Sequence, residues 1–361
     1  MNIGITFGAY CPLHQGHLDV IMKAKKQNDI CFVFVAGYDD DRGGDLLPLN
    51  QRYTIIKDFL SCENVIVEYI NDTELGLDES MSDSNWTVWL DYLHQIIKKY
   101  RYDIYLEQLN WYVSEAPYKT QILRYGNEHG IKTNCDLLDR TKNPISGTLC
   151  RTEPLKHWKY ITAPFRSYYS HNILIAGTAS EGKTTLTQDI GKYFNLPYSY
   201  EKGRDNCKFK PDYDLNVKDF IYNIYEQHKY NEQLISSPQN PGVFVSDTDN
   251  LVTLMYAYFY SKRENFKLSE DDYNLLYNLA RAYEKTTKWD KIFLLKPATK
   301  PIVDDGERYL GDSDYEIRCE FYEFLKNLYT DFGYEYEELQ GGDYYNNFER
   351  VKNYIKSLYK E

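Results

Sequence analysis

Residues 172–184 read NILIAGTASEGKT, an apolar run followed at once by a loop that ends in Gly-Lys-Thr. The run predicts a buried β-strand, and the loop matches GxxxxGK[ST] in full before a helix predicted over 183–194. In that context the backbone N–H groups of the loop cradle a β-phosphate, Lys183 bridges the β- and γ-phosphates, and Thr184 holds Mg²⁺. The predicted ATP contacts are Gly177, Gly182, Lys183, Thr184 and Thr185.

Acidic residues accompany this P-loop. Glu181 lies inside the loop, where its charge is expected to weaken the attraction for phosphate slightly. The run 243–247 reads VFVSD and predicts a strand that ends at Asp247. A carboxylate at the carboxyl end of a strand can bind the metal or face the attacking hydroxyl. Asp247 is therefore predicted to be catalytic and to share the metal with Thr184, although it can equally cap a helix predicted over 249–262.

Further charged residues follow the P-loop helix. The segment 304–308 reads DDGER, and together with Arg318 it is typical of a mobile loop that brings arginines to the transferred phosphoryl group. Arg308 and Arg318 are therefore predicted to contact ATP. Glu201 and Arg204, in YEKGR, lie where small P-loop kinases contact the acceptor.

The N-terminal half contains a second candidate phosphate site. A strand predicted over 2–7 runs into GAYCPLHQGH (residues 8–17) and then into a helix over 17–27. His14 and His17 flank Gly16 near a helix N-terminus, which favours a phosphate, and both imidazoles can donate to phosphate oxygens. On this motif alone, a pair of structural loop histidines is the alternative.

The segment ISGTLCR (residues 145–151) is the predicted partner of these histidines. Its two hydroxyls and its guanidinium can be directed at a polyphosphate. A strand–HxGH–helix unit followed by ISxTxxR resembles the nucleotidyltransferase superfamily of adenylyltransferases, in which both motifs hold the phosphates of ATP. The resemblance implies catalytic roles for His14, His17 and Arg151, and ATP contacts at Gly8, His14, His17, Ser146, Thr148 and Arg151. No protein nucleophile is needed, because a substrate phosphate oxygen attacks the α-phosphorus in line and pyrophosphate leaves.

Short apolar runs alternate with helical patterns through both halves. The predicted strands are 2–7, 30–36, 64–70, 103–106, 172–176, 243–247 and 291–295, and the predicted helices are 17–27, 50–61, 84–100, 183–194, 216–235, 249–262, 270–286, 314–331 and 344–358. This alternation predicts an α/β fold with two tandem parallel-sheet domains. The resemblance and the P-loop motif given above imply that they are a Rossmann-like nucleotidyltransferase followed by a P-loop kinase. The aromatic segment 152–170 is predicted to connect them, with domains at 1–165 and 166–361.

Composition excludes several classes of protein. With 54 acidic residues against 42 Lys and Arg, the net charge of −12 argues against a protein that binds nucleic acid by neutralising its phosphates. The seven cysteines form no CxxC pair, which predicts free thiols and a cytoplasmic protein. No apolar run is long enough for membrane insertion. The oligomeric state stays open, and a homo-oligomer is among the alternatives.

The motifs FGAYCPLHQGH, GYDDDRG, PISGTLCR, GTASEGKTTL, YEKGR, SDTD and DDGERYLG follow one another in this order. Over essentially all 361 residues the chain resembles the NadR family, bifunctional NMN adenylyltransferases and ribosylnicotinamide kinases. The resemblance implies that nicotinamide riboside and ATP give NMN, and that NMN and ATP give NAD and pyrophosphate, with Mg²⁺ as cofactor. Some members carry an N-terminal helix-turn-helix; HxGH begins at residue 14 here, so none is expected.

The family resemblance also implies substrate contacts. It implies that Trp86 lies near the nicotinamide and that Glu201, Arg204, Asp247 and Asp249 surround the riboside. From the residues alone, Trp86 can stack on a flat ring, although a Trp on a helix face is more often part of the core. Arg42, in GYDDDRG, can reach a phosphate and is predicted to bind NMN. Arg52 is expected at the surface.

Two other functions stay open at this point. A fused phosphopantetheine adenylyltransferase and dephospho-coenzyme A kinase shares HxGH-type and P-loop chemistry, but not the DDGERYLG and GYDDDRG segments. A sensor of nicotinamide nucleotides without turnover is the second alternative. Complete phosphate motifs in both halves favour an enzyme over a sensor.

Overall fold

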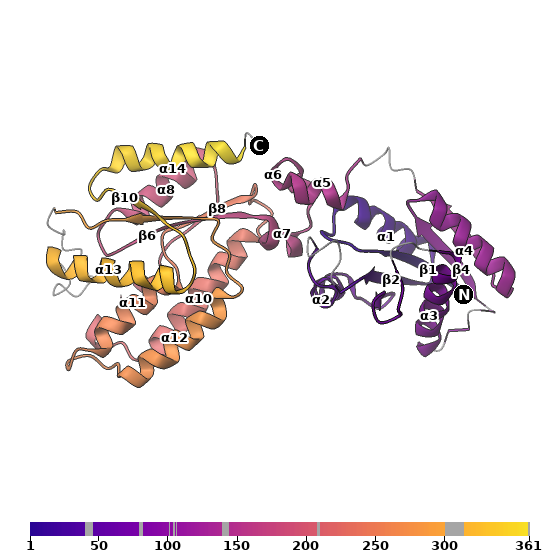
Figure 1. The fold of residues 1–361 in the computed structure, drawn as a ribbon, viewed down its shortest axis with the longest axis horizontal. Coiled ribbons are helices and arrows are strands. Elements are labelled where there is room, and N and C mark those ends of the chain that lie inside the picture. Colours follow the sequence, from indigo (N-terminus) through magenta and orange to yellow (C-terminus); the bar gives the residue numbers. More distant parts are fainter. Residues whose placement is uncertain are drawn as a thin grey trace. The chain divides into compact units, whose positions relative to one another are not determined.

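The computed structural model describes residues 1–39, 46–78, 82–100, 102–103, 105, 107–138, 144–207, 210–299 and 314–359. The chain divides into two compact units, Met1–Phe165 and Arg166–Glu361 (Figure 1). Within the described ranges, no helix has the length and apolar character needed to cross a lipid bilayer.

The described residues of the first unit form a parallel sheet of five strands in the order β3-β2-β1-β4-β5. The strands are β1 (Asn2–Gly8), β2 (Ile30–Gly37), β3 (Val65–Asn71), β4 (Gln108–Val113) and β5 (Thr133–Leu137), and the longer helices are α1 (Gln15–Gln27), α2 (Leu49–Leu60), α3 (Asp83–Lys99) and α4 (Ala116–His129). Short helices follow: α5 (Gly147–Thr152), α6 (Pro154–His157), η3 (Trp158–Tyr160) and, across the boundary, α7 (Ala163–Tyr169).

Both faces of this sheet are covered. Side chains of α3 and α4 pack with Ile3 and Ile5 of β1 in one apolar cluster. α1 lies close to β1 at Gly4, where a Cβ would stand 2.7 Å from Nδ2 of Asn28. The strand order reverses between β1 and β4, and open α/β sheets bind their ligands beyond the carboxyl ends of the strands at such a point.

The described residues of the second unit form another parallel sheet, in the order β10-β9-β6-β8-β7. Its strands are β6 (His171–Gly177), β7 (Tyr198–Ser199), β8 (Val243–Ser246), β9 (Lys291–Leu295) and β10 (Glu337–Leu339). Its α-helices are α8 (Lys183–Phe194), α9 (Gly203–Cys207), α10 (Val217–Ile235), α11 (Asn250–Ser261), α12 (Glu270–Glu284), α13 (Tyr315–Asp331) and α14 (Tyr344–Leu358).

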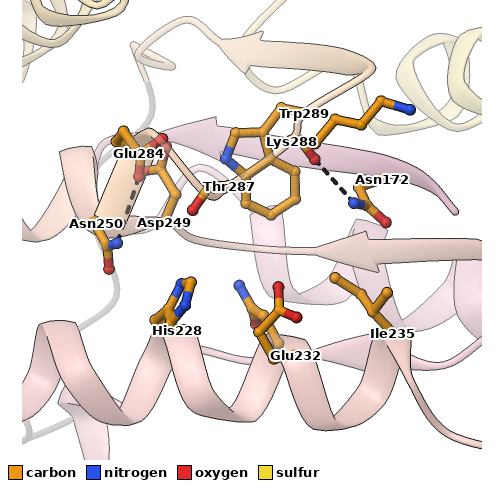
Figure 2. A pocket seen from close by; sticks show the side chains of 11 residues that line it. Asn172, His228, Glu232, Ile235, Asp249, Asn250, Glu284, Thr287, Lys288 and Trp289 are labelled. Carbon is orange, nitrogen blue, oxygen red and sulfur yellow. Dashed lines mark hydrogen bonds between the residues drawn. The ribbon is translucent and has the colours of Figure 1, made fainter. Parts of the chain in front are cut away.

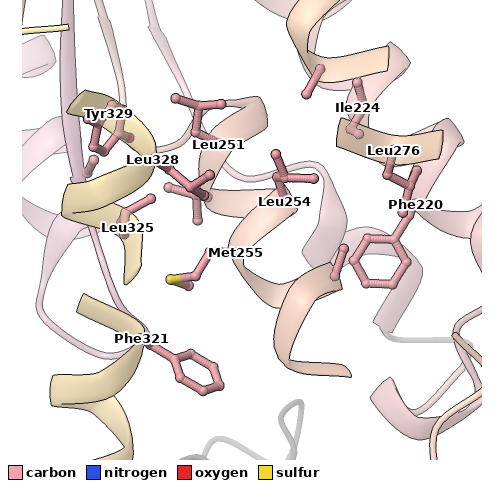
Figure 3. Packing of buried hydrophobic residues seen from close by; sticks show 14 of the residues in the cluster. Phe220, Ile224, Leu251, Leu254, Met255, Leu276, Phe321, Leu325, Leu328 and Tyr329 are labelled. Carbon is pink, nitrogen blue, oxygen red and sulfur yellow. The ribbon is translucent and has the colours of Figure 1, made fainter. Parts of the chain in front are cut away.

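Helix α11 is at the centre of the main core of this unit. Figure 1 shows α8 and α14 on one side of the sheet and α10 to α13 on the other. Leu254 and Met255 of α11 are fully buried in one cluster with Leu325 of α13 and Leu276 of α12 (Figure 3). This apolar packing therefore holds α13 against α11 and α12.

The predicted fold class, two tandem α/β domains with parallel sheets, is confirmed. Of the strand predicted at 103–106, only Asp103 and Tyr105 lie within the described residues, and neither is in a strand: the N–H of Tyr105 donates to Oδ1 of Asp103, and the N–H of Glu107 donates to the carbonyl of Asp103. The next strand begins at Gln108 instead. Segment 152–170, predicted as a connection, contains α6, η3 and α7.

Several elements were not predicted from the sequence: α4, β5, β7, α9 and β10. For α4 a signal exists, since Pro117 stands in its first turn and Gly130 ends it with φ +67°. Proline at the start and glycine at the end of a helix are the usual boundary residues.

Candidate functional site

The first candidate site lies where β1 ends and α1 begins. His14 is the N-cap residue of α1, and His17 lies in its first turn. Their imidazole rings stack with centroids 3.6 Å apart, and Nδ1 of His17 accepts a hydrogen bond from the backbone N–H of His14 at 3.5 Å. Gly8 is the last residue of β1 and lies just before this turn in the chain. Two imidazoles and a helix N-terminus at the carboxyl edge of a sheet suit a bound phosphate.

The structure brings the ISGTLCR segment against this turn. The guanidinium of Arg151 donates to the carbonyl of Cys11 and to Oγ1 of Thr148, the latter at 3.3 Å. Ser146 is the N-cap residue of α5, and Thr148 is exposed in its first turn. At Gly147 a Cβ would stand 3.0 Å from the Cys11 carbonyl oxygen, so α5 lies directly on the turn.

Two further contacts hold these motifs together. A Cβ at Gly16 would stand 3.1 Å from both the His14 ring and the Ile145 side chain. Thr162, after α5, donates to the carbonyl of Leu13 through its backbone N–H and through Oγ1, at 3.2 and 2.9 Å. The residues predicted for the phosphates of ATP, His14, His17, Ser146, Thr148 and Arg151, are therefore gathered at one edge of the first sheet.

Arg52 is not a surface residue, contrary to the expectation from the sequence. It is fully buried in α2, where its Nε donates to the carbonyl of Leu47 at 2.7 Å. One terminal nitrogen donates to the carbonyls of Ala9 and Ala36, at 2.7 and 3.3 Å. Arg52 thus forms hydrogen bonds both with the turn after β1 and with the end of β2. A signal was present, because Arg52 falls on the buried stripe of α2 with Leu49, Ile56 and Leu60.

Trp86 lies in an aromatic cluster of the first unit. Its side chain is 4% exposed, and its ring packs against Phe7, Trp89 and Tyr118. This placement fits a core residue, and a contact with nicotinamide stays a prediction. Arg42, the other predicted NMN contact, lies outside the described residues.

The second candidate site is the loop between β6 and α8. A Cβ at Gly177 would stand 2.8 Å from the carbonyl oxygen of Leu295, so only glycine fits where β6 ends. Gly182 has φ +83°, which turns the chain into α8. Nζ of Lys183 donates to the carbonyl of Thr178 at 2.7 Å, so its ammonium lies beside the loop. The predicted P-loop therefore has the geometry that its sequence implies.

A cavity of about 210 Å³ opens at this loop. It is lined by residues 180–185 and by Arg204. Nε of Arg204 lies 3.2 Å from Oε2 of Glu201, so the two residues predicted to contact the acceptor substrate lie together. Arg204 also brings a second cation to the phosphate cavity. The exposed Thr185 and the half-buried Thr184 belong to the same lining.

The residues present fit a magnesium ion. Oγ1 of Thr184 donates to Oδ2 of Asp247 at 2.7 Å, while Oδ1 of Asp247 is buried with no hydrogen-bond partner among the described residues. Burial raises the pKa of the Asp247 carboxyl to about 6, although the hydrogen bond from Thr184 lowers it. A buried carboxylate oxygen beside a hydroxyl is an oxygen-only donor set, which Mg²⁺ prefers.

Asp249 caps a helix in this structure, and the riboside contact implied for it stays a prediction. It is the N-cap residue of α11: its Oδ1 accepts from the N–H of Val252 at 2.9 Å, and its Oδ2 accepts from the hydroxyl of Tyr329 at 3.0 Å. The helix cap proposed for Asp247 thus belongs to Asp249. Burial raises the pKa of the Asp249 carboxyl.

Asp249 also borders a second, small cavity (Figure 2). The cavity lies between α10, represented by His228 and Glu232, and the segment that contains Trp289. Its volume of about 20 Å³ accommodates a single water-sized molecule and not a nucleoside.

Arg318 lies in α13, within the helix predicted over 314–331, where it is 3% exposed. Its guanidinium binds Oε1 of Glu181 at 2.7 Å. An ion pair and the packing of α13 hold Arg318 in this structure, and its contact with ATP stays a prediction. Arg308 lies outside the described residues.

Comparisons with known proteins give the same division of the chain. A cytidylyltransferase-like family model matches residues 5–153, and an AAA domain model matches residues 172–346. The trifunctional NAD biosynthesis/regulator proteins NadR of Salmonella typhimurium and Escherichia coli are each 27% identical over all of this chain and 84% of their own length.

Two solved structures are similar over nearly the whole chain. A crystal structure of NadR protein in complex with NR has 30% identity and a TM-score of 0.81, and covers 98% of this chain and 96% of its own. A NadR structure with NAD and AMP-PNP has 29% identity and a TM-score of 0.80 over the same shares.

We predict that Arg52→Met lowers the free energy of unfolding of the first unit by about 2–4 kcal/mol, because three backbone carbonyls lose a buried donor. Urea unfolding measures this loss. Lys57→Met, on an exposed position of the same helix, is the matched control and should change it by less than about 0.5 kcal/mol. Equal effects of the two substitutions would contradict the role given to Arg52.

We predict that Asp247→Asn stabilises the second unit in the absence of nucleotide and metal. The unfolded carboxyl titrates near 3.8 and the folded one near 6, so the folded state binds more protons between these values and stability falls as pH rises. Above pH 6 the full cost of the buried charge is present. Its removal should therefore raise the free energy of unfolding of the second unit by about 1–3 kcal/mol at pH 7.5. The gain should shrink toward pH 5.

Urea unfolding at both pH values measures this effect. Asp271→Asn, at an exposed position of α12, is the control and should show no such pH-dependent gain. A loss of stability on Asp247→Asn at pH 7.5 would refute the prediction.

Proposed function

The chain belongs to the NadR family, and we propose that each of its two phosphate sites catalyses one step of NAD salvage. The protein is a bifunctional enzyme that combines a nucleotidyltransferase with a small-molecule kinase. In this proposal the second unit, 166–361, phosphorylates nicotinamide riboside with ATP to give NMN. The first unit, 1–165, adenylylates NMN with ATP to give NAD and pyrophosphate.

One observation supports the proposal: each unit brings together groups that are predicted to bind phosphate. Arg151 reaches across to the turn that contains His14 in the first unit, and the P-loop stands beside Asp247 in the second. A sensor of nicotinamide nucleotides would need one such site, and a coenzyme A enzyme would not share the similarity along the whole chain.

In the first unit, we assign catalysis to positioning and to stabilisation of charge. An oxygen of the NMN phosphate attacks the α-phosphorus of ATP, a new P–O–P bond forms, and the bond to pyrophosphate breaks. His14, His17 and Arg151 would neutralise the charge that develops on the phosphoryl oxygens. Ser146 and Thr148 would hold the leaving pyrophosphate, and Trp86 and Arg42 would contact NMN.

In the second unit, the riboside hydroxyl attacks the γ-phosphorus of ATP, and ADP leaves. Lys183 and the loop N–H groups hold the β- and γ-phosphates, while Arg204 would approach the transferred group and Glu201 the riboside. Thr184 and Asp247 would hold Mg²⁺, which supplies charge neutralisation at the phosphates.

We also propose a reducing compartment, the cytoplasm, and substrates that are small molecules. The cysteines whose side chains the structure describes are free thiols, and the net charge of −12 does not favour binding to nucleic acid.

We predict that single substitutions separate the two activities. Lys183→Ala should lower phosphorylation of nicotinamide riboside by about 100-fold or more and leave adenylylation of supplied NMN intact, because the lost charge acts only in the second unit. His17→Ala should do the reverse. Chromatography of the nicotinamide products, after incubation with ATP and Mg²⁺, measures both activities in one sample.

Matched controls exist for both substitutions. Lys192→Ala, at an exposed position of α8, and His129→Ala, at the exposed end of α4, should leave both activities within about twofold of wild type. Loss of both activities from either Lys183→Ala or His17→Ala in a folded protein would refute the two-site division. Consumption of dephospho-coenzyme A in place of the riboside would refute the substrate.

A further inference from the structure

The phosphate loop of the second unit contains an acid that faces away from the phosphate cavity. Glu181 lies between Ser180 and Gly182, and all three line the cavity. A carboxylate at this place, close to a polyphosphate in a partly desolvated site, would repel it strongly. The Glu181 side chain, however, is 0% exposed, so it points into the protein.

Glu181 is bound on three sides inside the unit. Its Oε1 lies 2.7 Å from the guanidinium of Arg318, its Oε2 accepts from the N–H of Ala298 at 2.8 Å, and Thr178 Oγ1 lies 3.4 Å from Oε1. Arg318 also donates to the carbonyl of Ala298 at 2.9 Å. The carboxylate therefore joins the phosphate loop to α13 and to the segment after β9.

The two charges of this pair have opposite consequences for ATP. Loss of the Arg318 cation would leave a buried, uncompensated anion within the phosphate loop, and such single removals from buried pairs are strongly unfavourable. Loss of the Glu181 anion would leave a cation, which does not repel phosphate. A pair that served stability alone would show no such asymmetry in ATP affinity.

We propose that Arg318 is a positioning residue of the kinase reaction, which neutralises Glu181 and thereby keeps the phosphate loop attractive to ATP without touching the substrate. This inference rests on the proposed riboside kinase activity of the second unit. It assigns to Arg318 an indirect action through Glu181, in place of the direct ATP contact expected from the sequence.

The test compares four proteins: wild type, Arg318→Met, Glu181→Gln and the double variant. NMN formation from nicotinamide riboside is measured over a range of ATP concentrations. Arg318→Met should raise the KM for ATP by about tenfold or more with a smaller change in kcat, whereas Glu181→Gln should stay within about threefold of wild type. The double variant should return the KM for ATP to within about threefold of wild type.

Other outcomes overturn the inference. Equal increases in KM for the two single variants, or a double variant as poor as Arg318→Met, would mean that the pair acts only in stability. If Arg318→Met does not fold, as judged by thermal unfolding, the comparison of Arg318→Lys with Arg318→Gln replaces it; the lysine variant should keep the wild-type KM and the glutamine variant should not.

The failure of the proposed function is distinguishable from the failure of this inference. Wild-type protein that forms no NMN would refute the kinase assignment. Wild-type activity with no asymmetry between the variants would refute only the role of Arg318. Adenylylation of supplied NMN by the first unit, measured in each sample, reports the amount of folded first unit.

Discussion

Both candidate sites lie in a turn that follows a central parallel strand and leads into a helix. In each unit the chain makes this turn through a non-glycine residue with positive φ, Tyr10 at +49° and Ser180 at +61°. Such conformations are uncommon and persist where the surrounding structure holds them. The buried strands β1 and β6 and the helices that follow them supply this support.

The buried charges differ in how many of their polar atoms have a hydrogen-bond partner among the described residues. Arg52 has three carbonyl acceptors, and Asp249 has a donor at each oxygen, so these contacts stabilise the fold. Asp247 keeps one buried oxygen without a partner among the described residues, which is unfavourable unless a ligand supplies one. A cation at that oxygen would turn the same feature into a binding site.

The sequence was sufficient for those parts of the sites that are contiguous. The P-loop and HxGH each lie between a strand and a helix, so their local pattern carries their geometry, and the confirmed α/β fold follows from the alternation of elements. Motifs also placed the distant pairs Arg151 with the HxGH turn and Asp247 with Thr184, whereas the partners of Glu181 and Asp249 carry no motif and were not predicted. Arg318 lies 137 positions from Glu181, and Tyr329 lies 80 positions from Asp249. Strands of two or three residues, such as β7 and β10, are too short to show a periodic pattern.

The attachment of α13 has an evolutionary consequence. Arg318 near its start binds Glu181, and Tyr329 near its end binds Asp249, so one helix carries partners for acids on two separate loops. Neither member of the Glu181–Arg318 pair can be exchanged first without an intermediate that holds a lone buried charge. The proposed asymmetry makes the order of exchange matter, because replacing Glu181 first would keep ATP binding whereas replacing Arg318 first would not. An acid at this place in the loop therefore constrains a codon 137 positions away.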